Sequence, residues 1–156
     1  MRLKSKTALV TGAGGGLGGA TARRFAAEGA AVLCSDLNLA QAEKTVAEIN
    51  SAGATAIAFE CDVADANQCK AQVAETISQF GHIDILVNSA GVSLHKLALD
   101  TTMEDWDRVL NINLTGSFLT AQAAARVMAE TGGGKIIQIG SISGQRGNMG
   151  GAAYGA

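Results

Sequence analysis

The chain of 156 residues is 47% hydrophobic and 17% charged, and its formal net charge is −2. This balance is typical of a folded globular protein rather than a disordered one, and the length suits one domain with a real core. Acidic and basic residues are interspersed, so no basic stripe predicts nucleic-acid binding. The longest apolar runs, such as 83–87, are too short to span a membrane, and the basic start at 1–4 is not followed by a signal-peptide hydrophobic stretch. We therefore expect a cytoplasmic protein.

The three cysteines, Cys34, Cys61 and Cys69, form no Cys-x-x-Cys pair. Reduced, partly buried thiols are the favoured interpretation over a disulfide or a metal role. No spacing of His, Cys and Asp predicts a metal site. Glycine is abundant, at 20 residues, and proline is absent; the glycines gather at 12–19 and from 132 onward, so they mark particular loops.

Short apolar runs alternate along the chain with segments of helical spacing. Strands are predicted at 7–11, 31–35, 56–60, 83–87 and 135–139. Besides a helix that begins near Tyr154, helices are predicted at 17–28, 40–52, 65–80 and 102–129. The last of these begins with Thr102 and Asp105, which resemble a capping box with Asp where Glu or Gln is preferred.

The strands are continuous apolar runs rather than alternating ones, which indicates burial on both faces of a parallel sheet. Strict alternation of strand and helix then predicts an α/β fold, a doubly wound parallel sheet of the Rossmann type with five strands. No internal boundary or repeat is visible, so residues 1–156 are interpreted as a single domain. A ligand is expected at the carboxyl ends of the strands.

A glycine-rich loop at 12–19 lies between the first strand and the first helix. Backbone N–H groups at a helix start favour an anion, and glycine lets a pyrophosphate approach the main chain. Gly14-x-Gly16-x-x-Gly19 fits the general dinucleotide pattern, although a glycine-rich turn without a ligand is the alternative. The strand before it, the helix after it and an acid at Asp36 favour nucleotide binding.

Asp36 ends the second predicted strand, and its carboxylate can accept hydrogen bonds from ribose hydroxyls. The same charge would repel a 2′-phosphate, and neither the neutral residues that follow, Leu37 and Asn38, nor Gly15 in the loop would offset it. The sequence therefore predicts NAD rather than NADP. A solvated loop acid or a helix cap is the structural alternative.

Several motifs stand in the same order as in the short-chain dehydrogenase/reductase family, which the whole chain resembles. They are Thr11-Gly12-x-x-x-Gly16-x-Gly18, Asp62-Val63, Asn88-Ser89-Ala90-Gly91, Asn111-Ile112-Asn113-Leu114, and the pair Ser141 and Tyr154. The third motif has Ser where the family has a second Asn. The resemblance implies an oxidoreductase that transfers hydride between NAD(H) and a secondary alcohol or ketone, with Asp62 at the adenine amino group.

The resemblance also implies roles for individual residues. Tyr154 is the expected acid/base, Ser141 orients the substrate oxygen, and Asn113 holds a water in the proton relay. Taken singly, each has a structural alternative. Tyr154 could be an aromatic residue at the start of a helix, Ser141 could form a hydrogen bond at the end of a strand, and Asn113 could be a polar residue within a helix. The expected cofactor-binding residues are Gly12, Gly14, Gly15, Gly16, Leu17, Gly18, Asp36, Leu37, Asp62, Val63, Asn88, Ala90 and Gly91. Ser93 and His95 follow the cofactor loop and could face the substrate, although a solvated loop is the favoured interpretation.

The family's catalytic motif is Tyr-x-x-x-Lys, whereas the sequence gives Tyr154-Gly155-Ala156 and stops. We therefore expect a piece of a longer chain, with the C-terminal strands and helices of the domain missing and the fifth strand an exposed edge. Family members imply a homodimer or homotetramer and a small-molecule substrate such as a sugar, polyol, hydroxysteroid or 3-oxoacyl thioester. Two alternatives are a non-catalytic NAD-binding module and a Rossmann-like methyltransferase, the latter disfavoured by Asn88–Gly91 and by Ser141 with Tyr154.

Overall fold

The computed structural model describes residues 1–147 and 149–156 and contains one parallel sheet. Its strand order is β3-β2-β1-β4-β5, with every pair of neighbours parallel. The strands are β1 (Thr7–Thr11), β2 (Ala31–Asp36), β3 (Thr55–Glu60), β4 (Ile85–Asn88) and β5 (Lys135–Gln138). The predicted fold class is confirmed. Because the chain builds outward from β1 in both directions, the sheet has a switch point between β1 and β4, where α/β proteins bind ligands.

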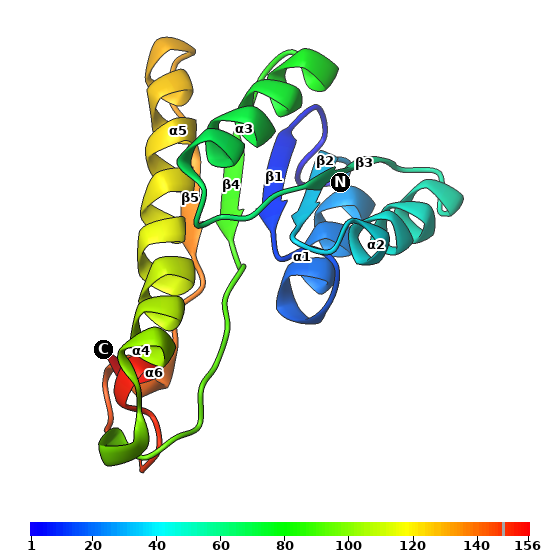
Figure 1. Cartoon of the computed structure of the whole chain (residues 1–156). Coiled ribbons are helices and arrows are strands. Elements are labelled where there is room, and N and C mark those ends of the chain that lie inside the picture. The colour runs from blue at the N-terminus through cyan, green and yellow to red at the C-terminus, as the bar shows by residue number, and fades with distance from the viewer. Residues whose placement is uncertain (148) are drawn as a thin grey trace.

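Helices cover both faces of this sheet (Figure 1). They are α1 (Gly16–Ala27), α2 (Leu39–Ser51), α3 (Ala66–Phe80), α4 (Met103–Leu110), α5 (Ser117–Glu130) and the short α6 (Ala152–Gly155). Successive residues of β1 point to opposite faces: Ala8 and Val10 pack with α1 and α2, whereas Leu9 packs with α3 and α5. The two cores explain why the strands are apolar without alternation.

Helix starts follow the local chemistry of the sequence. The Asn38 side chain accepts from the Gln41 N–H to begin α2, and Asp65 accepts from the Asn67 and Gln68 N–H groups to begin α3. The capping box predicted at Thr102 is present at α4, with both reciprocal hydrogen bonds to Asp105. These side chains satisfy N–H groups that have no partner within the helix.

The long helix predicted over 102–129 is present as a continuous helical run over 103–130, but it is not α-helical throughout. Between α4 and α5 lies a π-helical turn, η2 (Asn111–Gly116), which inserts a wider turn into the helix. The glycine at its end packs against Val63: a Cβ on Gly116 would lie 2.8 Å from Val63 Cγ2. Hydrophobic spacing is helical on both sides of this turn, so periodicity alone could not reveal it.

Strand β4 begins at Ile85 rather than at the predicted Ile83, because pairing with β1 starts where Ala8 faces Ile85. Ile83 nevertheless lies in the core. In the described part of the chain, β5 pairs with β4 alone, and its four residues are exposed, as expected for an edge strand. The described residues also form two short 3-10 turns, η1 (Ala98–Asp100) and η3 (Ile142–Gly144).

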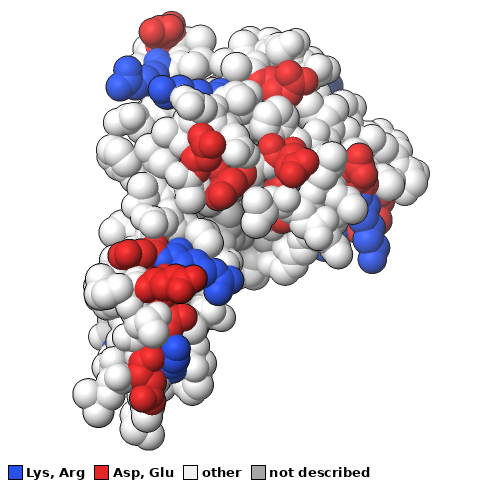
Figure 2. All heavy atoms as spheres, in the orientation of Figure 1, with Lys and Arg blue, Asp and Glu red and all other residues white. Residues whose placement is uncertain are grey.

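The three cysteines are free and buried, as the sequence predicts. Burial raises the pKa of the Cys34 thiol to about 12. On the face that Figure 2 shows, acidic and basic side chains are interspersed rather than gathered by sign. Within the described residues, none of the helices has the length and apolar character needed to cross a bilayer.

Candidate functional site

A pocket of about 700 Å³ opens at the carboxyl ends of the strands, at the switch point of the sheet. Its walls come from the glycine-rich loop after β1, the end of β2 and the segment after β4. The end of α4, the π turn η2, the segment after β5 and α6 complete them. The predicted site residues that line it are Gly12, Gly15, Gly16, Leu17, Gly18, Asp36, Ala90, Gly91, Asn113, Ser141 and Tyr154. Ser89, which the sequence showed only as part of a motif, also lines it, and lining residues that the sequence did not indicate include Val92, Val109, Leu110, Ile139 and Ala153.

Five predicted site residues do not line this pocket: Gly14, Leu37, Asp62, Val63 and Asn88. Leu37 is exposed. Asp62 accepts a hydrogen bond from the Ala64 N–H at 2.9 Å, and Val63 is buried against Gly116. A contact between Asp62 and adenine stays a prediction.

The glycine-rich loop approaches the segment after β4 too closely for any other residue. Gly12 has φ +64°, and a Cβ there would lie 2.9 Å from both Ala90 Cα and Ala90 N. A Cβ on Gly18 would collide with the carbonyl oxygen of Gly12. By contrast, a Cβ on Gly15 or Gly16 would meet nothing within 4 Å, so this part of the loop faces open space.

That open space lies at the start of α1, where Gly15 is the N-cap residue and no side chain caps the helix. The first N–H groups of a helix have no partner within it and carry partial positive charge. The geometry therefore fits a pyrophosphate, which needs donors and close approach to the backbone.

Asp36 connects the end of β2 to the glycine-rich loop. One carboxylate oxygen accepts from the Gly14 N–H at 2.9 Å, and the other accepts from the Asn38 N–H at 2.9 Å. Each oxygen keeps a further lone pair, so the carboxylate can still accept from a ribose hydroxyl in the pocket that it lines. Gly14 thus acts on the site through Asp36 rather than by lining it.

Thr11 is a supporting residue that the sequence showed only as part of a motif. Its side chain is buried, and Oγ1 accepts from the N–H groups of Ser89 and Ala90, both at 3.1 Å. These bonds hold the segment after β4 against Gly12. The sequence signal that could have indicated this role is a hydroxyl residue at the end of β1, directly before the first glycine of the loop.

Asn88 ties the end of β4 to the start of α5, because its Nδ2 donates to the carbonyl oxygen of Ser117 at 3.0 Å. Its Oδ1 is buried and has no hydrogen-bond partner among the described residues. The residue holds the strand end in place behind the pocket.

Asn113 lies in the π turn, and both atoms of its side-chain amide bond the main chain of Val92. The predicted water relay stays untested, but the amide is already paired. These two bonds use one N–H and one lone pair of the amide, so its second N–H and a further lone pair could still bond a water.

Ser141 and Tyr154 line the same pocket from η3 and α6. Ser141 is exposed, and its Oγ accepts from the Ser143 N–H at 3.1 Å, which leaves its own hydrogen free to donate. Tyr154 is half-buried. The open part of the glycine-rich loop and two side-chain hydroxyl groups therefore line one and the same pocket.

Comparison with known proteins gives consistent matches. A family model described as short chain dehydrogenase matches residues 6–156. A D-threitol dehydrogenase from Mycolicibacterium smegmatis is 44% identical over 140 residues, covering 90% of this chain and 54% of that enzyme. A 3-oxoacyl-[acyl-carrier-protein] reductase from Synechocystis sp. is 42% identical over 158 residues, covering 99% of this chain and 63% of the reductase.

Among solved structures, a 7α-hydroxysteroid dehydrogenase complexed with NADH and 7-oxo glycochenodeoxycholic acid superposes with a TM-score of 0.95 at 37% identity. The match covers 99% of this chain and 60% of that one. The chain thus spans between about half and two thirds of the length of these relatives.

Proposed function

The chain belongs to the short-chain dehydrogenase/reductase family, and we propose that it serves the transfer of hydride between NAD(H) and a secondary alcohol or its ketone. Membership in this family excludes the methyltransferase alternative. The observation that carries the proposal is a single pocket lined both by the open part of the glycine-rich loop and by Ser141 and Tyr154.

The bound nicotinamide would accept or supply the hydride. Alcohol oxidation also requires the substrate hydroxyl to lose its proton, so a positioned acid/base is needed beside it. Tyr154 is the phenol in the pocket and would take that proton, and Ser141 would donate to the substrate oxygen and hold it near the phenol. A phenol is a weak acid, so a neighbouring positive charge would favour its ionised form.

NAD is proposed over NADP because Asp36 lines the pocket with a negative charge. The carboxylate is fixed by the Gly14 and Asn38 N–H groups, and the residues that follow it carry no positive charge. A 2′-phosphate near this carboxylate would be repelled, whereas a free ribose hydroxyl could donate to it.

The relatives suggest the substrate class. Their names include dehydrogenases of D-threitol, of (3R)-3-hydroxyacyl-CoA and of a 7α-hydroxysteroid, each of which contains a secondary hydroxyl group. We propose a small secondary alcohol for this protein too. A single domain over residues 1–156, a cytoplasmic location and a homodimeric or homotetrameric assembly are part of the same proposal.

Turnover by the full-length polypeptide tests the proposal, with NAD and these three alcohols as probes. Tyr154→Phe removes the acid/base while keeping the ring, so it should abolish oxidation and leave NAD affinity unchanged. Ser141→Ala should lower kcat by about a hundredfold. Activity retained in Tyr154→Phe would disprove the assignment of Tyr154, and NAD binding without any turnover would favour a non-catalytic NAD-binding module.

A further inference from the structure

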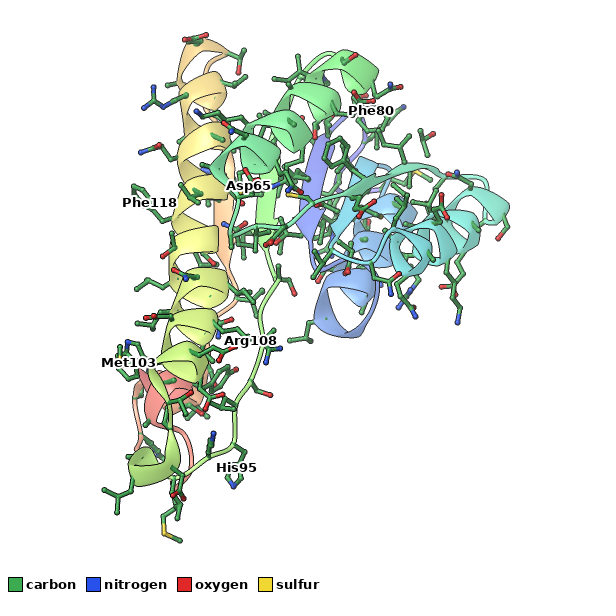
Figure 3. The ribbon with its side chains drawn as sticks, in the orientation of Figure 1. Asp65, Phe80, His95, Met103, Arg108 and Phe118 are labelled. Atoms are coloured by element: carbon green, nitrogen blue, oxygen red, sulfur yellow. The ribbon has the colours of Figure 1, made fainter. Side chains whose placement is uncertain are left out.

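The segment from Val92 to Leu97 runs from the pocket to the far end of the molecule, where α4 and α6 lie (Figure 1). At its start, Val92 is bonded to Asn113 of the π turn. Figure 3 shows His95 on the later part of this segment, at the same end of the molecule as α6. The contacts made there involve Lys96, a residue that does not line the pocket.

The main chain of Lys96 is attached to the turn that precedes α6. Its N–H donates to the carbonyl oxygen of Gly150 at 2.8 Å, and Lys96 forms an isolated parallel bridge with Gly151. The carbonyl oxygen of Gly151 in turn accepts from the Gly155 N–H at 2.7 Å, which closes the turn of α6 that contains Tyr154. Gly150 is buried with φ +86°, and a Cβ there would lie 2.9 Å from the His95 imidazole.

The side chain of Lys96 is attached to the start of α4. Its Nζ donates to Asp105 Oδ2 at 2.6 Å, and that oxygen also accepts from the Thr102 N–H at 3.2 Å as part of the capping box. Both side chains are partly shielded, with 37% and 25% of their surface exposed. The ammonium beside Asp105 holds the pKa of that carboxyl at about 2, so the carboxyl stays ionised at neutral pH.

Lys96 therefore joins two helices that together form one wall of the pocket. Val109 and Leu110 come from α4, and Ala153 and Tyr154 come from α6. If the side-chain attachment were lost, Lys96 would no longer be tied to the start of α4, and the bridge to Gly150 and Gly151 would be held only from a partly exposed segment. The position of the phenol would then be less well fixed, and catalysis is sensitive to misplacement of about 1 Å.

We propose that Lys96 is a positioning residue for Tyr154: its ion pair with Asp105 holds the main-chain bridge that sets the start of α6. This inference rests on the proposed role of Tyr154. Lys96 acts through Gly150 and Gly151 and does not touch substrate or cofactor.

The test uses the full-length polypeptide and three variants. Lys96→Met keeps the length of the side chain but removes its charge, and Lys96→Arg keeps the charge. Asp105→Asn retains an oxygen that can accept from the Thr102 N–H while removing the ion pair. With the best of the three alcohol probes, Lys96→Met and Asp105→Asn should lower kcat about ten- to a hundredfold at unchanged NAD affinity, and Lys96→Arg should recover most of the loss.

A second readout does not depend on activity. Amide hydrogen exchange over residues 152–156 should become about tenfold faster in Lys96→Met, because the turn of α6 opens more often, while exchange in β1 should not change. If Lys96→Met does not fold, kcat and amide hydrogen exchange over residues 152–156 in Asp105→Asn test the inference instead.

The possible results separate this inference from the proposed function. Unchanged kcat, or unchanged exchange over 152–156, in a folded Lys96→Met would overturn the inference while leaving Tyr154 as the acid/base. Wild-type activity that survives Tyr154→Phe would overturn the assignment of Tyr154, and the positioning role would fall with it. If the wild type oxidises none of the alcohols, the proposed function is wrong, and the exchange measurement alone decides whether Lys96 fixes the start of α6.

Discussion

Asn113 and Val92 are joined by a reciprocal pair of hydrogen bonds: Asn113 Nδ2 donates to the Val92 carbonyl oxygen at 2.9 Å, and Asn113 Oδ1 accepts from the Val92 N–H at 2.8 Å. Asn113 belongs to the π turn, and Val92 belongs to the segment after β4. An amide side chain offers a donor and an acceptor at the spacing of a peptide group, so Asn113 extends the pairing of the main chain. The π turn is thereby fixed against the pocket.

Asn113→Ala should lower the free energy of unfolding by about 2 kcal/mol, because it leaves the N–H and the carbonyl of Val92 without partners. The same variant should lower kcat, because Val92 lines the pocket. Urea unfolding followed by circular dichroism measures the first effect. Asn111→Ala is the control, since Asn111 is an exposed residue of the same π turn; equal losses in both variants would contradict the role of the Asn113 pair.

Gly18→Ala and Gly15→Ala should differ sharply in stability. A Cβ at Gly18 collides with the Gly12 carbonyl, so the loop must shift, and the free energy of unfolding should fall by about 1–3 kcal/mol. A Cβ at Gly15 meets nothing, so the change there should stay within about 0.5 kcal/mol. Thermal unfolding of the two variants measures the difference. Equal losses of stability would show that the close contact of position 18 with the Gly12 carbonyl does not require a glycine.

Asp36→Asn should reduce the preference for NAD over NADP about tenfold, because it removes the charge that opposes a 2′-phosphate. The ratio of the two dissociation constants is the quantity to measure. Asp62→Asn serves as the control, since NAD and NADP share the adenine that Asp62 is predicted to contact. An unchanged ratio in Asp36→Asn would mean that the carboxylate acts only as a support for Gly14 and Asn38.

The ion pair of Lys96 and Asp105 should make stability depend on pH in the acid range. The Lys96 ammonium, followed by the Thr102 backbone, lowers the pKa of Asp105 from 3.8 to about 2. Because the folded state binds this proton less readily than the unfolded state, the stabilisation is present above about pH 4 and is lost as the pH falls through about 2.

Unfolding of the wild type and of Asp105→Asn between pH 5 and pH 2 measures this effect. The difference in stability between the two proteins should shrink as the pH falls. A constant difference over that range would contradict the pKa shift of Asp105. Exposure of the pair makes the effect sensitive to salt, so ionic strength must be held constant.

The fold could be predicted because the sequence features that indicate its strands and helices are local and recur along the chain. Five apolar runs, the glycines after helices and the cap at Thr102 each act within a few residues, and the structure contains the elements they indicate. The π turn was not predictable, because the hydrophobic spacing is helical on both sides of it, and the contact of Gly116 with Val63 joins elements distant in the sequence.

The candidate site was predictable where a motif names the residue that lines the pocket, as at Gly12, Asp36 and Tyr154. It was not predictable where a residue acts through the main chain of another segment. Lys96 is of this second kind, and so is the role of Thr11, which the sequence showed only as part of a motif: each bonds atoms more than 50 residues away along the chain, at Gly150 and Ala90 respectively. Sequence spacing carries no information about such pairs until the fold is known.

Calorimetric titration of the protein with NAD and with NADP tests the central claim most directly. The proposal predicts that NAD binds with a stoichiometry of one per chain and that NADP binds at least about tenfold more weakly, because of the charge at Asp36. NADP binding as tight as NAD, or no binding of either nucleotide to the folded full-length polypeptide, would contradict the account.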